Sequence, residues 1–103
     1  MTALELLKSA RELLSDPARH QPCVMAKTAE GKPCYPHTKE AVKWGIVGAL
    51  CAQQVPDSVY RQARDALYRE FNDEGLMQYE NGHSHEDVIA GFDRAIAAME
   101  AAE

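Results

Sequence analysis

The feature that most constrains the fold is a run of nine uncharged residues, WGIVGALCA, at positions 44–52. A helix that is apolar on every side has no face to turn toward water, so it has to be buried on every side. Thr38 is a suitable N-cap for such a helix, and no proline interrupts the chain before Pro56. We therefore expect a buried central helix over residues 39–54. Two glycines within it each cost about 1 kcal/mol relative to alanine, which indicates that other segments approach the helix closely.

The rest of the chain predicts a mainly α fold of about four helices. In three further segments the apolar residues recur every three or four positions, the pattern of a helix with one buried face. These segments are residues 3–15, residues 57–71 and the stretch that begins at Ser84, whereas residues 75–83 are expected to form a loop. The chain has 103 residues, of which 46% are hydrophobic and 26% charged. We expect a single small helical domain, residues 1–103, with a core of ordinary size.

A proline-rich connector separates the first helix from the central one. Residues 17–37 contain four of the five prolines of the chain, and a helix does not tolerate this density. Two short segments, 23–27 and 32–35, flank a turn at Gly31, where glycine allows the positive φ that such turns need. The pattern predicts a short two-stranded ribbon between the first and second helices, with the segment of Pro33 at its edge.

The same connector contains two mirrored pairs, His20-x-x-Cys23 and Cys34-x-x-His37. Two thiolates and two imidazoles suit tetrahedral zinc, so zinc is the one candidate cofactor and these four residues are its candidate ligands. A proline inside each pair restricts the turn that would wrap the ion, and the helices supply a core without it. The competing interpretation has a buried Cys23 facing Cys34 across the ribbon, with both histidines exposed.

A cysteine-dependent enzyme is a third alternative, because Cys23 and Cys34 each have a histidine three residues away. Cys51 lies in the apolar helix, where a thiol behaves as a small hydrophobic group. His83 and His85 have the positions of a loop tip and a first-turn helical residue. The chain contains no phosphate-binding glycine loop and no other catalytic signature. We therefore expect a protein without catalytic residues or a bound organic cofactor.

The net charge of −5 is unevenly distributed along the chain. Residues 1–45 have a balance of +2, and residues 46–103 have a balance of −7. Binding to nucleic acid depends on neutralising phosphates, so an acidic chain argues against it and favours a protein partner instead. No apolar run approaches the roughly 18 residues that cross a membrane, and the opening MTALELLKSAR has the pattern of an amphipathic helix. With few cysteines, the expected location is the cytoplasm, where thiols stay reduced.

Three segments together suggest a family. They are AVKWGIVGAL at positions 41–50, Phe71-Asn72-Asp73, and HEDVI at positions 85–89. They resemble a family of small bacterial and phage proteins known only as a domain of unknown function, with Ala-x-x-Trp-Cys-x-x-Gly-Ala-Leu and Trp-Asn-Asp motifs. Gly45 stands where that family usually has cysteine, and Phe71 where it usually has tryptophan. The resemblance implies a helical fold and a bacterial or phage source, and it implies no activity.

Four residues of the third predicted helix form the candidate protein-contact surface: Tyr60, Arg61, Arg64 and Tyr68. The two tyrosines are eight positions apart and so lie near one face of the helix, with the arginines beside them. Tyrosine and arginine are enriched at protein interfaces. The alternative is that the rings lie at the edge of the core with their hydroxyls in water. We predict a small non-catalytic interaction or accessory module that binds another protein.

Overall fold

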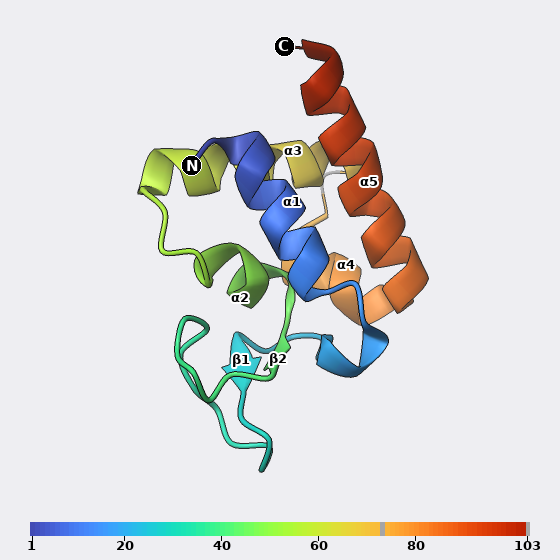
Figure 1. Ribbon diagram of the computed structural model, residues 1–103. Coiled ribbons are helices and arrows are strands. Elements are labelled where there is room, and N and C mark those ends of the chain that lie inside the picture. The colour runs from blue at the N-terminus through green and yellow to red at the C-terminus, as the bar shows by residue number, and fades with distance from the viewer. Residues whose placement is uncertain (73, 103) are drawn as a thin grey trace.

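A computed structural model describes residues 1–72 and 74–102 and confirms a mainly α-helical fold (Figure 1). Within these residues there are five α-helices, and a two-stranded antiparallel ribbon lies between the first two. The helices are α1 (Ala3–Leu13), α2 (Ile46–Cys51), α3 (Asp57–Glu70), α4 (Leu76–Gly82) and α5 (His85–Ala102). A 3-10 turn, η1 (Pro17–Arg19), follows α1, and the ribbon consists of β1 (Ala26–Lys27) and β2 (Lys43–Trp44).

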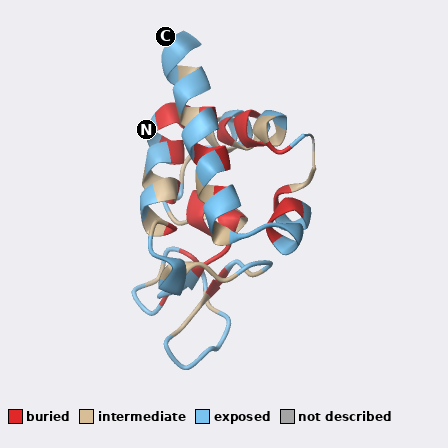
Figure 2. Cartoon of the chain, turned by 90° about the vertical axis from the view of Figure 1, so that its right-hand side faces the viewer, coloured by how far each residue is buried: buried red, intermediate tan, exposed pale blue. Residues whose placement is uncertain are grey.

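The helices α1, α3 and α5 enclose the core, and α2 and α4 lie beneath them next to the ribbon (Figure 1). Helix α1 contacts α2, α3 and α5, because its leucines recur at helical spacing on the face that it buries. Figure 2 shows the buried residues on the inward sides of the helices and exposed ones on the outer sides. Thr2 and Glu5 begin α1 with a capping box, in which each side chain accepts a hydrogen bond from the backbone of the other.

The central helix is largely buried, although Val47 and Cys51 are only half-buried, and it is much shorter than residues 39–54. Helix α2 begins at Ile46, after the chain has paired with β1 as strand β2. Gly45 precedes the helix in an extended conformation, and its N–H donates to the carbonyl oxygen of Val24 (3.1 Å). Thr38 donates its hydroxyl to a turn carbonyl instead of capping a helix. The backbone of this segment forms its hydrogen bonds with the ribbon. A helix that began at residue 39 would break these hydrogen bonds.

The ribbon forms with a different second strand from the one predicted. Strand β1 pairs with β2, with Ala26 opposite Trp44 and Lys27 opposite Lys43. The turn at Gly31 is present with a φ of +83°, and it returns the chain along the other side of β1. There the contact is a single bridge between Lys27 and Pro33. Backbone hydrogen bonds flank this bridge, from the Thr28 N–H to the Lys32 carbonyl oxygen (2.9 Å) and from the Cys34 N–H to the Ala26 carbonyl oxygen (3.2 Å), so the predicted pairing is present only over this short stretch.

Residues 75–83, expected to be a loop, contain the short helix α4. Its buried side chains are Leu76, Tyr79 and Glu80, whose spacing places them on one helical face. The Tyr79 ring stacks between Phe71 (centroids 3.9 Å apart) and His83 (3.8 Å). Helix α4 is therefore held by tertiary contacts that compensate for its short length, and it brings Glu80 into the interior.

Candidate functional site

The structure places the four candidate zinc ligands in separate surroundings. The His20 ring is hydrogen-bonded through Nε2 to Glu80, and the Cys23 thiol donates to a backbone carbonyl of α4 (3.5 Å). Cys34 packs against the hydrophobic core, and the His37 ring stacks on a neighbouring tyrosine. Among residues 1–72 and 74–102, no group of three or more His, Cys, Asp or Glu side chains is positioned to hold a metal ion.

The competing interpretation of the connector is wrong in two details. Cys23 is exposed instead of buried, and it adopts a left-handed backbone conformation with a φ of 63°. The side chain of His20 is buried instead of exposed, with 4% of it accessible. The three cysteines are free thiols. Both differences have one cause, which is that the connector folds over the end of α4 and presents His20 to Glu80.

Glu80 is the centre of a buried polar cluster that the sequence analysis missed. Its side chain is 1% exposed and accepts three hydrogen bonds. The donors are the His20 ring, the Cys23 N–H (3.2 Å) and the Ile46 N–H (2.9 Å). A buried carboxylate is tolerated when its oxygens are satisfied in this way. The available signal was the spacing of Glu80 from Leu76 and Tyr79, which put a carboxylate on an apolar helical face.

The cluster connects three elements that are distant in sequence. His20 and Cys23 belong to the connector, Ile46 is the first residue of α2, and Glu80 belongs to α4. The His20 ring also lies beside the His85 ring (centroids 5.4 Å apart), and His85 Nε2 donates to a backbone carbonyl at the end of α1 (2.6 Å). The polar atoms of the cluster are occupied by contacts that hold these elements together. We therefore interpret the cluster as structural.

The contacts of Cys23 and the surroundings of Cys51 are not those of an activated nucleophile. A catalytic thiol needs a base in hydrogen-bond contact with it, and the Cys23 thiol contacts a backbone carbonyl. The Nε2 atom of His20 is already engaged by Glu80. Burial raises the pKa of the Cys51 thiol, so this group stays protonated at neutral pH.

Zinc removal provides a direct test of the mirrored His and Cys pairs. We expect a chelator such as EDTA to leave the melting temperature of the protein unchanged, because Glu80 already fixes His20 and Cys23. Structural zinc stabilises small domains by about 10–16 kcal/mol, so loss of a bound ion would be obvious in a thermal melt. Protein purified without a metal-affinity tag, melted with and without the chelator, gives the measurement. A large fall in melting temperature that added zinc restores would contradict this expectation.

Three of the four predicted contact residues lie together on α3. The Arg64 guanidinium lies over both neighbouring rings, 6.0 Å from the Tyr60 centroid and 5.8 Å from the Tyr68 centroid. Asp65 holds the same guanidinium at 3.2 Å. Arg61 is separate, because it pairs with Asp57 one helical turn earlier (2.8 Å). We call Tyr60, Arg64 and Tyr68 the tyrosine–arginine face.

A cavity of about 380 Å³ lies beside this face, between α3, α2 and α4. The exposed Met77, with 47% of its surface accessible, lies at its edge. Burial raises the pKa of the Tyr60 hydroxyl, which therefore remains a hydrogen-bond donor at neutral pH. The ring of Tyr60 also packs against the core, so its position is fixed. The lining residues are Val47, Tyr60, Arg64, Tyr68, Gly75, Leu76, Met77 and Gln78.

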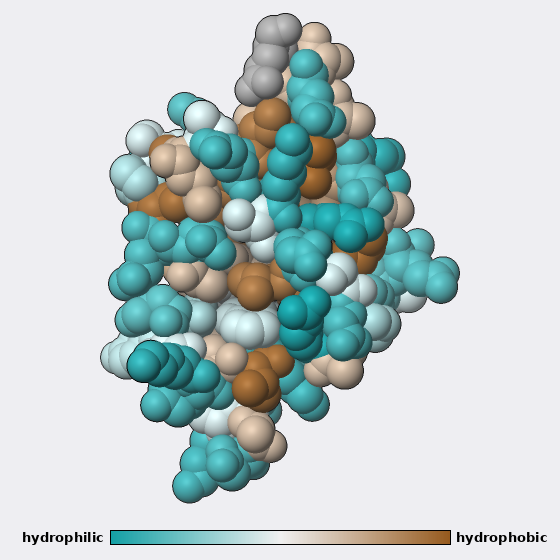
Figure 3. Space-filling view, viewed as in Figure 1, coloured by the Kyte–Doolittle hydropathy of each residue, from teal (hydrophilic) through white to brown (hydrophobic). Residues whose placement is uncertain are grey.

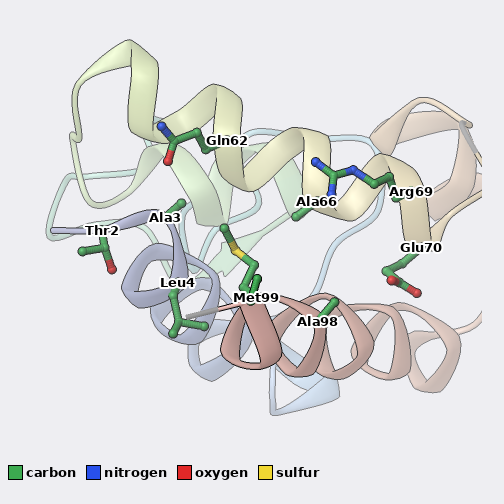
Figure 4. A pocket seen from close by; sticks show the side chains of 10 residues that line it. Thr2, Ala3, Leu4, Gln62, Ala66, Arg69, Glu70, Ala98 and Met99 are labelled. Atoms are coloured by element: carbon green, nitrogen blue, oxygen red, sulfur yellow. The ribbon is translucent and has the colours of Figure 1, made fainter.

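A second cavity, of about 390 Å³, lies between the start of α1, α3 and the end of α5 (Figure 4). Met99 points from α5 toward α3, and Arg69 and Glu70 lie along the α3 side. None of the candidate site residues from the sequence lines this cavity. It contains no grouping of nucleophile, base or metal ligands, and it adds no chemistry to the tyrosine–arginine face.

The scan against protein-family models and the searches of curated proteins and of solved structures found no match. In the part of the chain that the structure describes, no helix combines the length and the apolar character needed to cross a membrane. The function has therefore to be argued from the geometry of this chain.

Proposed function

We propose that this chain is a small, non-catalytic interaction module that binds another protein through the tyrosine–arginine face. The main support is the position of the Arg64 guanidinium, which lies over two tyrosine rings next to a cavity of about 380 Å³. Tyrosine and arginine are the residues most enriched, with tryptophan, among those that dominate binding energy at interfaces. A guanidinium in this setting can bind a partner carboxylate or a backbone carbonyl.

Contacts within the chain already orient the side chains of this face. Asp65 and the two rings restrict Arg64, and packing against the core restricts Tyr60. Ordering a long side chain on binding costs about 0.5–1.5 kcal/mol, so a side chain that is already ordered binds more tightly. Met77 at the edge adds a flexible apolar group that adapts to the shape of a partner.

Charge supports a partner with a basic rim. Residues 46–103, which contain this face, have a balance of −7. Opposite charge at the rim of an interface increases the rate of association and selects among partners. Three free thiols suit a reducing compartment, and we propose that binding takes place in the cytoplasm.

Substitution of Arg64 tests the proposal. Immobilised wild-type protein should capture one partner from a lysate of its source cells, and Arg64→Ala should reduce the capture at least tenfold. The expected loss corresponds to about 2 kcal/mol, the threshold that defines a dominant interface residue. The matched control is Arg61→Ala, which removes the same charge from the same helix but lies outside the cavity. Circular dichroism of each variant verifies the fold.

Two results would contradict the proposal. One is a monomeric protein that captures no partner above the level of a blank resin. The other is equal capture of the same partner by Arg64→Ala and wild type, which would place the contact elsewhere on the molecule.

A further inference from the structure

Exposed apolar side chains cluster around the ribbon. Five large apolar residues are exposed in the described part of the chain, and three of them belong to this region: Met25, Tyr35 and Val42. Met25 is 42% exposed and Tyr35 is 73% exposed. In Figure 3 the lower part of the molecule, where the ribbon lies, shows apolar surface bordered by hydrophilic side chains. Single exposed apolar residues are normal, but a cluster of them indicates a binding surface.

Met25 and Tyr35 line a groove of about 610 Å³ that we call the ribbon groove. Ala26 forms part of its wall and is 2% exposed, so β1 has one buried and one accessible side. The ring of Tyr35 stacks on His37, with the ring centroids 5.9 Å apart. Apart from Lys27, every lining residue is uncharged. The groove is lined by Val24, Met25, Ala26, Lys27, Pro33, Cys34, Tyr35 and Pro36.

Two lysines stand side by side on the ribbon, and one of them, Lys27, lines the groove. Lys27 and Lys43 are directly opposite in the antiparallel register of β1 and β2, so their side chains leave the same face of the ribbon. Like charges in directly opposed positions are destabilising. Neither lysine forms an ion pair with an acidic residue within residues 1–72 and 74–102. The pair is therefore an uncompensated positive site next to apolar surface.

The chain around the ribbon has an excess of positive charge, which also favours an acidic partner. Between Arg19 and Asp57 the chain contains four lysines and two glutamates, although the whole protein has a net charge of −5. A local positive site on an acidic protein attracts an acidic partner while the rest of the surface repels it, which restricts the partner to this place. Two lysines are too few for the phosphate contacts that nucleic acid binding requires.

We propose that the ribbon groove binds an acidic segment of another protein that also has apolar side chains. A carboxylate of the segment pairs with Lys27 and Lys43, and an adjacent apolar side chain lies in the groove against Met25 and Cys34. This site is separate from the tyrosine–arginine face, and it goes beyond the function proposed above. It makes the molecule capable of contacting two partners, or two parts of one partner.

The test uses defined peptides, because it then depends on no identified partner. A short fluorescein-labelled peptide of alternating glutamate and leucine is titrated with the full chain and followed by fluorescence anisotropy. Its controls are a glutamate–serine peptide, which lacks the apolar groups, and a lysine–leucine peptide, which reverses the charge. We expect saturable binding of the glutamate–leucine peptide alone, weakened by added salt.

Variants locate the site. Lys43→Glu should weaken binding of the glutamate–leucine peptide at least about tenfold, because it replaces attraction by repulsion at the groove. Lys8→Glu makes the same change of charge on α1, where Lys8 pairs with Glu100, and should bind as wild type does. Met25→Ser should weaken binding without changing the charge. Arg64→Ala should have no effect, so this result is independent of the tyrosine–arginine face.

Three results would overturn the proposal. Equal binding by Lys43→Glu and Lys8→Glu would show that only net charge matters. Binding of the glutamate–serine peptide as tight as that of the glutamate–leucine peptide would show that the groove is not used. A wild-type dimer in sedimentation that Lys43→Glu converts to monomer would identify a second copy of the chain as the occupant.

Discussion

Replacement of Glu80 by alanine is expected to lower the free energy of unfolding by about 3–5 kcal/mol, because each hydrogen-bond donor that loses its partner in the interior costs about 1–3 kcal/mol. The side chain of Glu80 is 1% exposed and accepts hydrogen bonds from His20, Cys23 and Ile46. The substitution leaves these three donors without their acceptor, and the Ile46 N–H among them is fully buried. Urea denaturation measures the change, and for a domain of this size each kcal/mol also lowers the melting temperature by about 4–8 °C.

Glu30→Ala is the matched control for this substitution. Glu30 is exposed in the turn of the connector, and its replacement makes the same change of net charge. We expect it to change stability by less than about 0.5 kcal/mol. Glu80→Gln should fall between the two, because the amide keeps one acceptor oxygen but turns an NH₂ group toward donors. A Glu80→Ala protein as stable as the Glu30→Ala protein would show that the buried cluster does not hold the connector.

Replacement of Gly48 by alanine is expected to lower the free energy of unfolding by at least about 2 kcal/mol, within the range found for overpacked cores. A Cβ at this position would lie 1.6 Å from the carbonyl oxygen of Met25 and 2.5 Å from its carbonyl carbon. Both are backbone atoms, so no side-chain rotation can relieve the contact. The ribbon has to move away from α2, and this outweighs the gain of about 1 kcal/mol that alanine brings to a helix.

Gly82→Ala provides the comparison, because Gly82 also lies in a short helix but an added Cβ meets nothing within 4 Å. We expect it to leave stability unchanged or to raise it by up to about 1 kcal/mol. Limited proteolysis adds a local measurement: the Gly48→Ala chain should be cut faster within the ribbon than wild type. Equal stability and equal cleavage of the Gly48→Ala and Gly82→Ala proteins would contradict the close approach of Met25 to α2.

The elements that the sequence predicted well are the helices whose apolar residues recur at helical spacing. Helices α1, α3 and α5 each bury one face at helical spacing, so local pattern was sufficient to find them. Helix α4 was missed because Glu80 interrupts its apolar face and Gly82 suggests a turn. The choice of β2 as the partner of β1 depends on contacts between residues 16 and 18 positions apart, which local preferences do not specify.

The candidate sites also differ in whether local sequence was sufficient to place their residues. Tyr60, Arg64 and Tyr68 were predicted to lie together because they share one helix, and the geometry of a helix fixes their spacing. His20, Cys23, Cys34 and His37 are related only by their mirrored spacing in a connector without regular structure. Their positions depend on what the connector contacts, and Glu80, 60 residues after His20, supplies the contact that orients His20.

By itself the sequence determined that the segment around Ile46 and Leu50 is buried, because a run without charge has no side to turn toward water. Only the tertiary structure decided what covers it. The backbone of Met25 crosses Gly48, and the carboxylate of Glu80 accepts from the first N–H of α2, 34 positions earlier in the chain. Burial follows from composition, which is local, whereas the identity of the covering groups follows from which distant segments can approach without steric conflict and with their hydrogen bonds satisfied.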